Sequence, residues 1–344
     1  MRRLRLRRLL RPEVALGLGV LLAITFAALR LIASRDYVFL PDKAHPVAPL
    51  VTVAGGHVRN HGGGIYFVDV VVRRASLLEQ IFGGPILTSG GDLVPPVDVV
   101  APGETDAEEE QASLSEMRQS QQTAAAVALK TAGRKVTTIE TGAQVDQIVL
   151  GYPAAGKLEP DDVIVAIDGK PVHSLQDLHA DLLGKKVGTT FRFTFLRGST
   201  RRTISLKTVP EVTGSKIGVI GIQVDQATRF RLPIRVSIDA HNVGGPSAGL
   251  AFALQVLQEL GQNVDHGHKI AATGTISPDG QVGEIGGIKQ KTIGAREAGV
   301  DAFLVPAGQN AADARKYAHG LRIIPVKNFQ QALHALATLP ATRG

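Results

Sequence analysis

The 344-residue sequence predicts an α+β protein that begins with an apolar helix. Residues 14–33 form an almost unbroken apolar segment of helical length. Phe191, Phe193 and Phe195 alternate with polar residues, which is the period of a half-buried strand. The mainly apolar residues 250–260 follow a glycine-rich turn, as expected for a buried helix. A chain of this length accommodates two or three domains.

The positive charge of the chain is concentrated at one end. The formal net charge is +7, and six arginines lie within the first 11 residues. Aromatic residues make up 4% of the chain and tryptophan is absent, so a nucleic-acid-binding surface is not expected. The absence of cysteine excludes disulfides, thiolate metal sites and a cysteine nucleophile.

The N-terminal region predicts a membrane protein. Residues 1–13 form a basic cytoplasmic tail, residues 14–33 a single transmembrane signal anchor, and residues 34–49 a tether, which places the rest of the chain outside the cytoplasm. A cleaved signal peptide is the alternative. The length of the apolar segment and the lack of a following Ala-x-Ala favour an uncleaved anchor.

Two strands are expected next, at residues 50–53 and 66–72, paired as a hairpin around a glycine-rich loop. This loop contains His57 and His61, but it offers no carboxylate partner, so no metal site is expected.

After these strands, the rest of the segment 50–133 is expected to form two helices separated by a loop. A helix is expected at 75–82, an acidic proline-rich loop at 92–112, and a longer helix from residue 114, capped by Ser113 or Ser115.

Residues 134–210 behave as a separate unit with a small sheet and one helix. Ser174 and Asp177 have the spacing of a capping box, and the leucines at 175, 178 and 182 give the helix an apolar face. The order of residues at 152–170 resembles the PDZ domains of bacterial envelope proteases, although Asp161 replaces a usual glycine.

PDZ domains bind extended peptides by strand addition beside a helix. The resemblance therefore implies a peptide-binding groove between the helix at Leu175 and a strand at 145–149 that begins with Val145. Gly142 and Ala143 are the candidates for the carboxylate-binding loop. The alternative is a structural domain without a ligand.

Residues 244–249 read Gly-Gly-Pro-Ser-Ala-Gly and contain the candidate nucleophile. Ser247 lies among small residues at the expected start of a helix, where its hydroxyl is accessible and free N–H groups face an anion. The alternative is that Ser247 is an ordinary helix cap.

A buried lysine is expected on the helix at residues 288–299. At 100° per residue, Lys291 lies in the middle of an apolar stripe formed by Ile288, Thr292, Ala295 and Ala298, whereas Lys289 and Arg296 face the polar side. Burial lowers the pKa of a lysine and lets it accept a proton from a serine. The alternative is a lysine that extends its ammonium group to solvent.

Residues 245–249, 273–274 and 285–299 resemble the Ser-Lys protease domain of the Lon family, in the family's order and spacing. The resemblance implies that Ser247 is the nucleophile and Lys291 the general base. It implies that Thr273 bonds the lysine, and it places supporting roles on Gly245, Pro246 and Ala248, whose loop supplies the backbone N–H groups for the oxyanion. Gly244 and Thr275 stand where acidic residues are common.

The whole arrangement resembles the bacterial membrane-anchored PDZ Lon-like proteases. It implies a Lon-type domain split into 50–133 and 215–340 around a PDZ unit, a homo-oligomeric ring, and protein or peptide substrates. The sequence contains no GxxxxGKS or GxxxxGKT loop, so ATP-independent endopeptidase activity outside the cytoplasm is expected, with no cofactor and no metal.

Two alternatives remain open. One is a catalytic triad in which His241 is the base and Asp239 orients it. The other is a membrane-anchored peptide-binding module whose protease site is vestigial.

Overall fold

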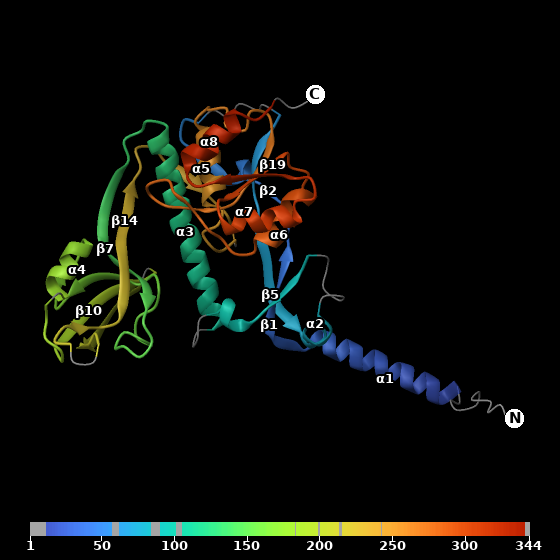
Figure 1. The fold of residues 1–344 in the computed structure, drawn as a ribbon, viewed down its shortest axis with the longest axis horizontal. Coiled ribbons are helices and arrows are strands. Elements are labelled where there is room, and N and C mark those ends of the chain that lie inside the picture. Colours follow the sequence, from blue (N-terminus) through green and yellow to red (C-terminus); the bar gives the residue numbers. More distant parts are fainter. Residues whose placement is uncertain are drawn as a thin grey trace.

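The computed structural model describes residues 12–56, 62–83, 90–100, 105–182, 184–198, 200–212, 215–241 and 243–340, without the side chains of 12–15. His57 and His61 lie outside these ranges. Figure 1 shows two lobes on either side of the long helix α3 (Asp106–Thr131), and α1 (Pro12–Leu31) extending away from both. The predicted α+β class is confirmed.

A five-stranded sheet forms the centre of the larger lobe. Its order is β2 (His45–Pro46), β4 (Gly64–Phe67), β16 (Lys269–Ala272), β19 (Ala302–Pro306) and β20 (Arg322–Val326). The last four strands are parallel, and β2 is antiparallel to β4. Every residue of α5 (Gly249–Glu259) is buried in this lobe.

Distant parts of the chain share the main core of this lobe. Residues between 47 and 67 and between 117 and 128 pack in one hydrophobic cluster with residues between 240 and 336, including α8 (Phe329–Ala337). A second cluster joins α6 (Ile288–Glu297) and α7 (Gln309–Tyr317) to the sheet. The short strands β17 (Thr275–Ile276) and β18 (Val282–Gly283) pair with each other, and β17 contacts α3 and α5.

The predicted hairpin is wrong. β3 (Val51–Val53), which follows the 3-10 turn η1 (Ala48–Leu50), pairs with β15 (Val236–Ile238). The expected strand at 66–72 is divided into β4 and β5 (Val70–Ser76), and β5 pairs with β1 (Ala33–Pro41). The strands bury their apolar faces against partners that are distant in sequence, which local alternation does not reveal.

The expected tether at 34–49 is also wrong, because β1 is the central strand of a sheet with the order β5–β1–β6. Tyr37 and Val38 are buried there. β5 leads into α2 (Leu77–Phe82), whose capping box pairs Ser76 with Glu79.

The expected acidic loop at 92–112 is largely replaced by regular structure, with β6 (Asp92–Val94), the 3-10 turn η2 (Pro96–Asp98) and the start of α3. Thr105 and Glu108 form a capping box, so the N-cap of α3 lies eight residues before the first predicted cap, Ser113. The acidic residues of its first turn favour the positive end of the helix dipole.

The smaller lobe contains a sheet with the order β11–β10–β8–β7–β14. Its elements are β7 (Thr137–Ile148), β8 (Val163–Ile167), β9 (Lys170–Pro171), α4 (Leu175–Leu182), β10 (Thr190–Arg197), β11 (Thr200–Lys207) and β14 (Ile222–Arg231), with β12 (Val209–Pro210) and β13 (Gly218–Val219) beside them. The predicted alternation at Phe191, Phe193 and Phe195 is confirmed, since all three are buried. Ser174 and Asp177 bond each other's backbone N–H groups at the start of α4.

α1 presents exposed apolar side chains, with Leu16 71% and Leu22 61% exposed. Within the described residues, no helix is both long enough and apolar enough to cross a bilayer. The predicted transmembrane segment at 14–33 is therefore not found there. The helix ends at Leu31, and the chain enters β1 at Ala33.

Candidate active site

Ser247 lies in the loop between β15 and α5, and α3 holds this loop at two points. The N–H of Gly245 donates to the carbonyl of Ser113 at 2.9 Å. The hydroxyl of Ser120 donates to the carbonyl of Pro246 at 2.9 Å. α3 also packs against α5, so the same helix holds the loop before Ser247 and the helix after it.

Ser247 is not a helix cap. α5 begins at Gly249, and its N-cap residue is Ala248, which makes no side-chain cap bond. The hydroxyl of Ser247 is instead bonded by the side chain of Lys291, with 2.6 Å between Nζ and Oγ. The serine is partly exposed and the lysine is buried.

Lys291 reaches Ser247 from the buried face of α6. The helix starts after Gly287, whose φ of 66° lies in the left-handed region that glycine adopts easily. Lys291 is 5% exposed and lies between Ile288 and Ala295, which are also buried. The helical geometry expected from the sequence thus places the ammonium group inside the protein and not in solvent.

Burial lowers the pKa of Lys291 from 10.5 to about 8, and the Asp69 carboxylate opposes this change. Burial also raises the pKa of Asp69, and nearby Asp42 raises it further. A substantial fraction of Lys291 is therefore a neutral amine at mildly alkaline pH, which is the form that accepts a proton.

The two neighbouring cationic side chains point elsewhere. Lys289 forms an ion pair with Asp92 at 2.6 Å. Arg296 donates to the carbonyl of Tyr317 at 3.2 Å. Of the two lysines of Lys-Gln-Lys, only Lys291 bonds Ser247.

Thr273 makes a different hydrogen bond from the expected one. Its hydroxyl donates to the backbone carbonyl of Ser247 at 3.1 Å, and the N–H of Gly274 donates to the same oxygen at 2.8 Å. No bond between Thr273 and Lys291 occurs among the described residues. Thr273 thus holds the backbone of the serine, because β16 ends beside the loop.

The alternative triad is not assembled. His241 is 74% and Asp239 is 71% exposed, and their side chains contact each other at 3.3 Å. Within the described part of the chain, the hydroxyl of Ser247 bonds Lys291 and not His241. The geometry therefore favours the Ser-Lys pair.

Two backbone N–H groups remain available beside the nucleophile. The N–H of Gly245 is bonded to Ser113, Pro246 has no N–H, and the N–H of Gly249 donates to the carbonyl of Pro246. The N–H groups of Ser247 and Ala248 donate to no acceptor in the described ranges. They lie at the start of α5, where an oxyanion is stabilised.

Residues 204–338 match the model of the Lon protease (S16) C-terminal proteolytic domain, and residues 126–208 match the PDZ domain model. The chain joins a PDZ domain to a Lon-type proteolytic domain. The predicted resemblances to PDZ domains and to the Lon-type protease domain are confirmed, and the Lon S16 domain implies a serine protease.

Curated relatives agree with this assignment. The Lon protease of Buchnera aphidicola is 33% identical over 132 residues, which are 38% of this chain and 17% of that protein. The Lon protease of Mesomycoplasma hyopneumoniae is 34% identical over 146 residues, 39% of this chain and 17% of that protein. The chain thus spans less than a fifth of the relatives it matches.

A solved PDZ domain also matches the chain. It belongs to an SdrC-like protein from Listeria monocytogenes and is 27% identical, covering 24% of this chain and 87% of that chain with a TM-score of 0.23.

The predicted peptide-binding residues of the PDZ domain are mostly structural. Ala143 and Val145 are fully buried in the core of the lobe. Gly142 has a φ of 149°, and a Cβ there would lie 2.4 Å from the carbonyl oxygen of Ile164. The expected edge at 145–149 is also wrong, because β14 pairs along this part of β7, and Val145 exchanges backbone bonds with Asp161 and Asp162 on the other side.

β14 is the edge strand of this sheet and lies beside α4. The side-chain oxygen of Gln226 in β14 accepts from the N–H of Leu175 at 3.0 Å, which ties the edge strand to the helix start. Asp161, the residue that replaces the usual glycine, has a φ of 68° in the left-handed region.

A cleft of about 350 Å³ separates α3 from β7 and β14 and reaches the nucleophile loop at Pro246. Its carboxylates include Glu116 of α3, Asp161 and Asp225 of β14. Burial raises the pKa of Glu116 to about 7, and Asp161 adds to this effect. The negative charge of the cleft therefore increases as the pH rises through 7.

Sequence reasoning missed the residues that support the site. In the sequence, Ser113 is only a candidate cap and Ser120 lies within the predicted helix, and no local pattern indicates their bonds to a loop more than 120 residues away. The close approach of α3 explains the glycine at position 244, because a Cβ there would lie 2.3 Å from Oγ of Ser113.

Proposed function

We propose that the chain is an ATP-independent serine endopeptidase in which Ser247 is the nucleophile and Lys291 the general base. The observation that carries the proposal is the 2.6 Å contact between Oγ of Ser247 and Nζ of Lys291, a lysine that is 5% exposed. An amine with a lowered pKa beside a serine hydroxyl is an activated Ser-Lys pair.

The reaction begins when neutral Lys291 removes the hydroxyl proton as Oγ attacks the peptide carbonyl. The N–H groups of Ser247 and Ala248 stabilise the negative oxygen that forms. The ammonium group of Lys291 then returns the proton to the leaving amine, which yields an acyl-enzyme. Water, deprotonated by Lys291, hydrolyses this ester and regenerates the serine.

The test is cleavage of an unfolded protein by the purified chain. Ser247→Ala is expected to lower kcat by at least about 10³ because the nucleophile is lost. The matched control is Lys289→Ala, which removes the neighbouring lysine that pairs with Asp92. Retained cleavage by Ser247→Ala would contradict the proposal, and peptide binding without cleavage by the unaltered chain would favour the vestigial alternative.

Substrate delivery is assigned to the PDZ domain. A peptide added to β14 would extend the sheet at its edge, beside α4. β14 also lines the cleft that reaches Pro246, so a bound chain has a path to the nucleophile. The expected substrates are unfolded chains or exposed ends, and a β14 variant such as Gln226→Pro should raise KM more than it lowers kcat.

ATP independence rests on the absence of a phosphate-binding GxxxxGKS or GxxxxGKT loop from this sequence. Cleavage rates are expected to be unchanged by ATP with magnesium. A ring of several copies follows from the likeness to Lon proteases, and light scattering of the purified chain tests it.

We assign the active site to the extracytoplasmic side of a membrane. The support is the arginine-rich start of the chain and the exposed apolar side chains of α1. Proteolysis of intact spheroplasts is expected to degrade the catalytic lobe. Protection of this lobe until the cells are lysed would contradict the location.

A further inference from the structure

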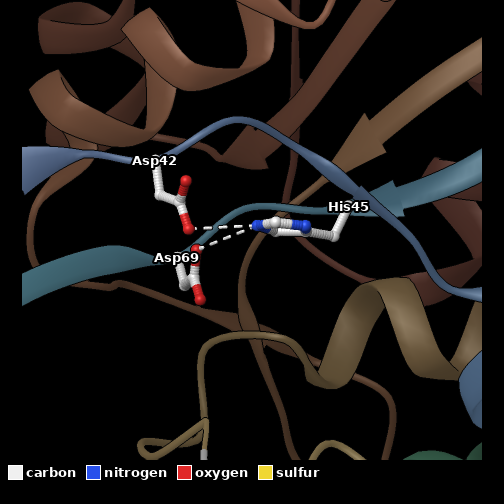
Figure 2. Close-up of side chains that lie close together, drawn as sticks. All are labelled: Asp42, His45 and Asp69. Atoms are coloured by element: carbon white, nitrogen blue, oxygen red, sulfur yellow. Dashed lines mark hydrogen bonds and ion pairs between the residues drawn. The ribbon is translucent and has the colours of Figure 1, made fainter.

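Three side chains with metal-binding chemistry converge near the helix that carries Lys291. Asp42 follows β1, His45 begins β2 and Asp69 lies between β4 and β5. Figure 2 shows the imidazole pointing at both carboxylates. One donor atom from each residue lies within 4.8 Å of the other two. Nε2 of His45 is 3.0 Å from Oδ2 of Asp42 and 4.0 Å from Oδ1 of Asp69.

The backbone holds the three residues in a fixed arrangement. His45 pairs with Phe67 across β2 and β4, which places Asp69 two residues beyond the paired position. The N–H of Lys43 donates to Oδ1 of Asp42 at 2.8 Å and leaves Oδ2 facing the imidazole. The histidine ring lies 5.5 Å from the Phe67 ring, between centroids.

The cluster is also attached to α6. The carbonyl of Asp42 approaches Gly294 so closely that a Cβ there would lie 1.7 Å from its oxygen. The N–H of Ala44 donates to the carbonyl of Gly294 at 3.4 Å. Gly294 is three residues after Lys291, so the segment carrying Asp42 and His45 contacts the same helix as the proposed catalytic base.

One oxygen of the cluster is left unsatisfied. Oδ1 of Asp69 is buried and has no hydrogen-bond donor within the described ranges. A buried carboxylate oxygen without a donor is costly, and a second carboxylate beside it adds repulsion. A cation between the two carboxylates would remove both penalties.

We propose that Asp42, His45 and Asp69 bind one divalent transition-metal ion, with zinc as the best match. An imidazole with two carboxylates suits zinc and its neighbours, whereas magnesium and calcium prefer oxygen ligands alone. Ligands about 2.0–2.2 Å from a tetrahedral zinc ion lie about 3.3–3.5 Å apart. The distances of 3.0 and 4.0 Å from Nε2 to the two carboxylates bracket this spacing.

The site is open to solvent on one side. The side chains of His45 and Asp42 are 46% and 38% exposed, and that of Asp69 is 25% exposed. Water therefore has access to a fourth coordination position. The bound ion would join the segment after β1, which contacts α6, to the connection between β4 and β5, so it would stabilise the lobe.

The test is zinc binding by the full, tag-free chain after treatment with a chelator. Competition with a chromophoric chelator is expected to give one zinc ion per chain, and zinc is expected to raise the Tm by several degrees. Cobalt should produce the visible absorption of a low-symmetry site. Magnesium at the same concentration should leave the Tm unchanged. These measurements do not depend on peptidase activity, so they can fail while the proposed function stands.

Variants locate the ion. His45→Gln and Asp69→Asn are each expected to weaken zinc binding at least about tenfold and to abolish the zinc-dependent rise in Tm. His241→Gln is the matched control, because it removes a histidine that also contacts a carboxylate but is exposed elsewhere. His45 is half exposed, so its variant tests the site even if Asp69→Asn fails to fold.

Absence of zinc binding by the unaltered chain would overturn the proposal, and the cluster would then be only a contact between the imidazole and two carboxylates. Equal zinc binding by the unaltered chain and by His45→Gln would overturn it as well, because the ion would lie elsewhere.

Discussion

The pH dependence of cleavage provides a quantitative test of the Ser-Lys mechanism. The pKa of Lys291 is about 8, because burial disfavours its ammonium form. The reactive form is the neutral amine, so kcat/KM should rise with pH and level off above the pKa. About one-tenth of the lysine is neutral at pH 7 and about nine-tenths at pH 9, which predicts a rise of about tenfold.

The assay is hydrolysis of a fluorogenic peptide between pH 6 and pH 9.5, with folding followed by circular dichroism. Lys291→Arg keeps the positive charge but cannot become neutral in this range, so its activity should be lost at every pH. Lys289→Arg is the matched control and should reproduce the unaltered profile. A rate that is constant from pH 6 to pH 9, or activity in Lys291→Arg, would refute the assignment of Lys291 as the base.

Three further outcomes follow from the packing around the site. Lys291→Met should unfold at higher denaturant concentration at pH 7 than the unaltered chain. The pKa of Lys291 is about 8, which is about 2.5 pH units below the 10.5 of a solvated lysine. Protonation of the buried lysine therefore costs about 3 kcal/mol. The cost is fully present below pH 8 and vanishes above 10.5, so the difference between the two chains should shrink over that range. Gly294→Ala should lower the free energy of unfolding by at least about 2 kcal/mol, because a Cβ there would lie 1.7 Å from a backbone oxygen. Gly286→Ala meets no atom within 4 Å and should have little effect. Ser120→Ala removes a bond to the loop that carries Ser247 and should lower kcat up to about tenfold, with little change in Tm. Denaturant titrations and steady-state kinetics measure these effects, and an unchanged kcat in Ser120→Ala would contradict the positioning role.

The local patterns that the sequence revealed concern single elements. The helical spacing around Lys291 distinguishes it from Lys289, and the alternation at 191–195 identifies a buried strand, because both depend on residues within one or two turns or pleats. The capping box at Ser174 is equally local. Such features need no knowledge of the partner element.

The features that the sequence did not reveal depend on pairing between distant segments. β3 pairs with β15 across more than 180 residues, and β14 closes the edge of β7 that the PDZ resemblance had reserved for a peptide. Asp42, His45 and Asp69 come together because β2 and β4 pair, which places Asp69 two residues beyond the partner of His45. Strand register across a sheet is set by burial of whole faces, which no local spacing records.

The burial of Lys291 has a consequence for the life of the chain before it is folded. In an unfolded chain the lysine is solvated, its pKa is that of a free side chain, and at neutral pH it carries a proton. A serine without a neutral amine beside it is a poor nucleophile. The Ser-Lys pair is therefore inactive in the unfolded chain, and it becomes active only when α6 has packed against the sheet.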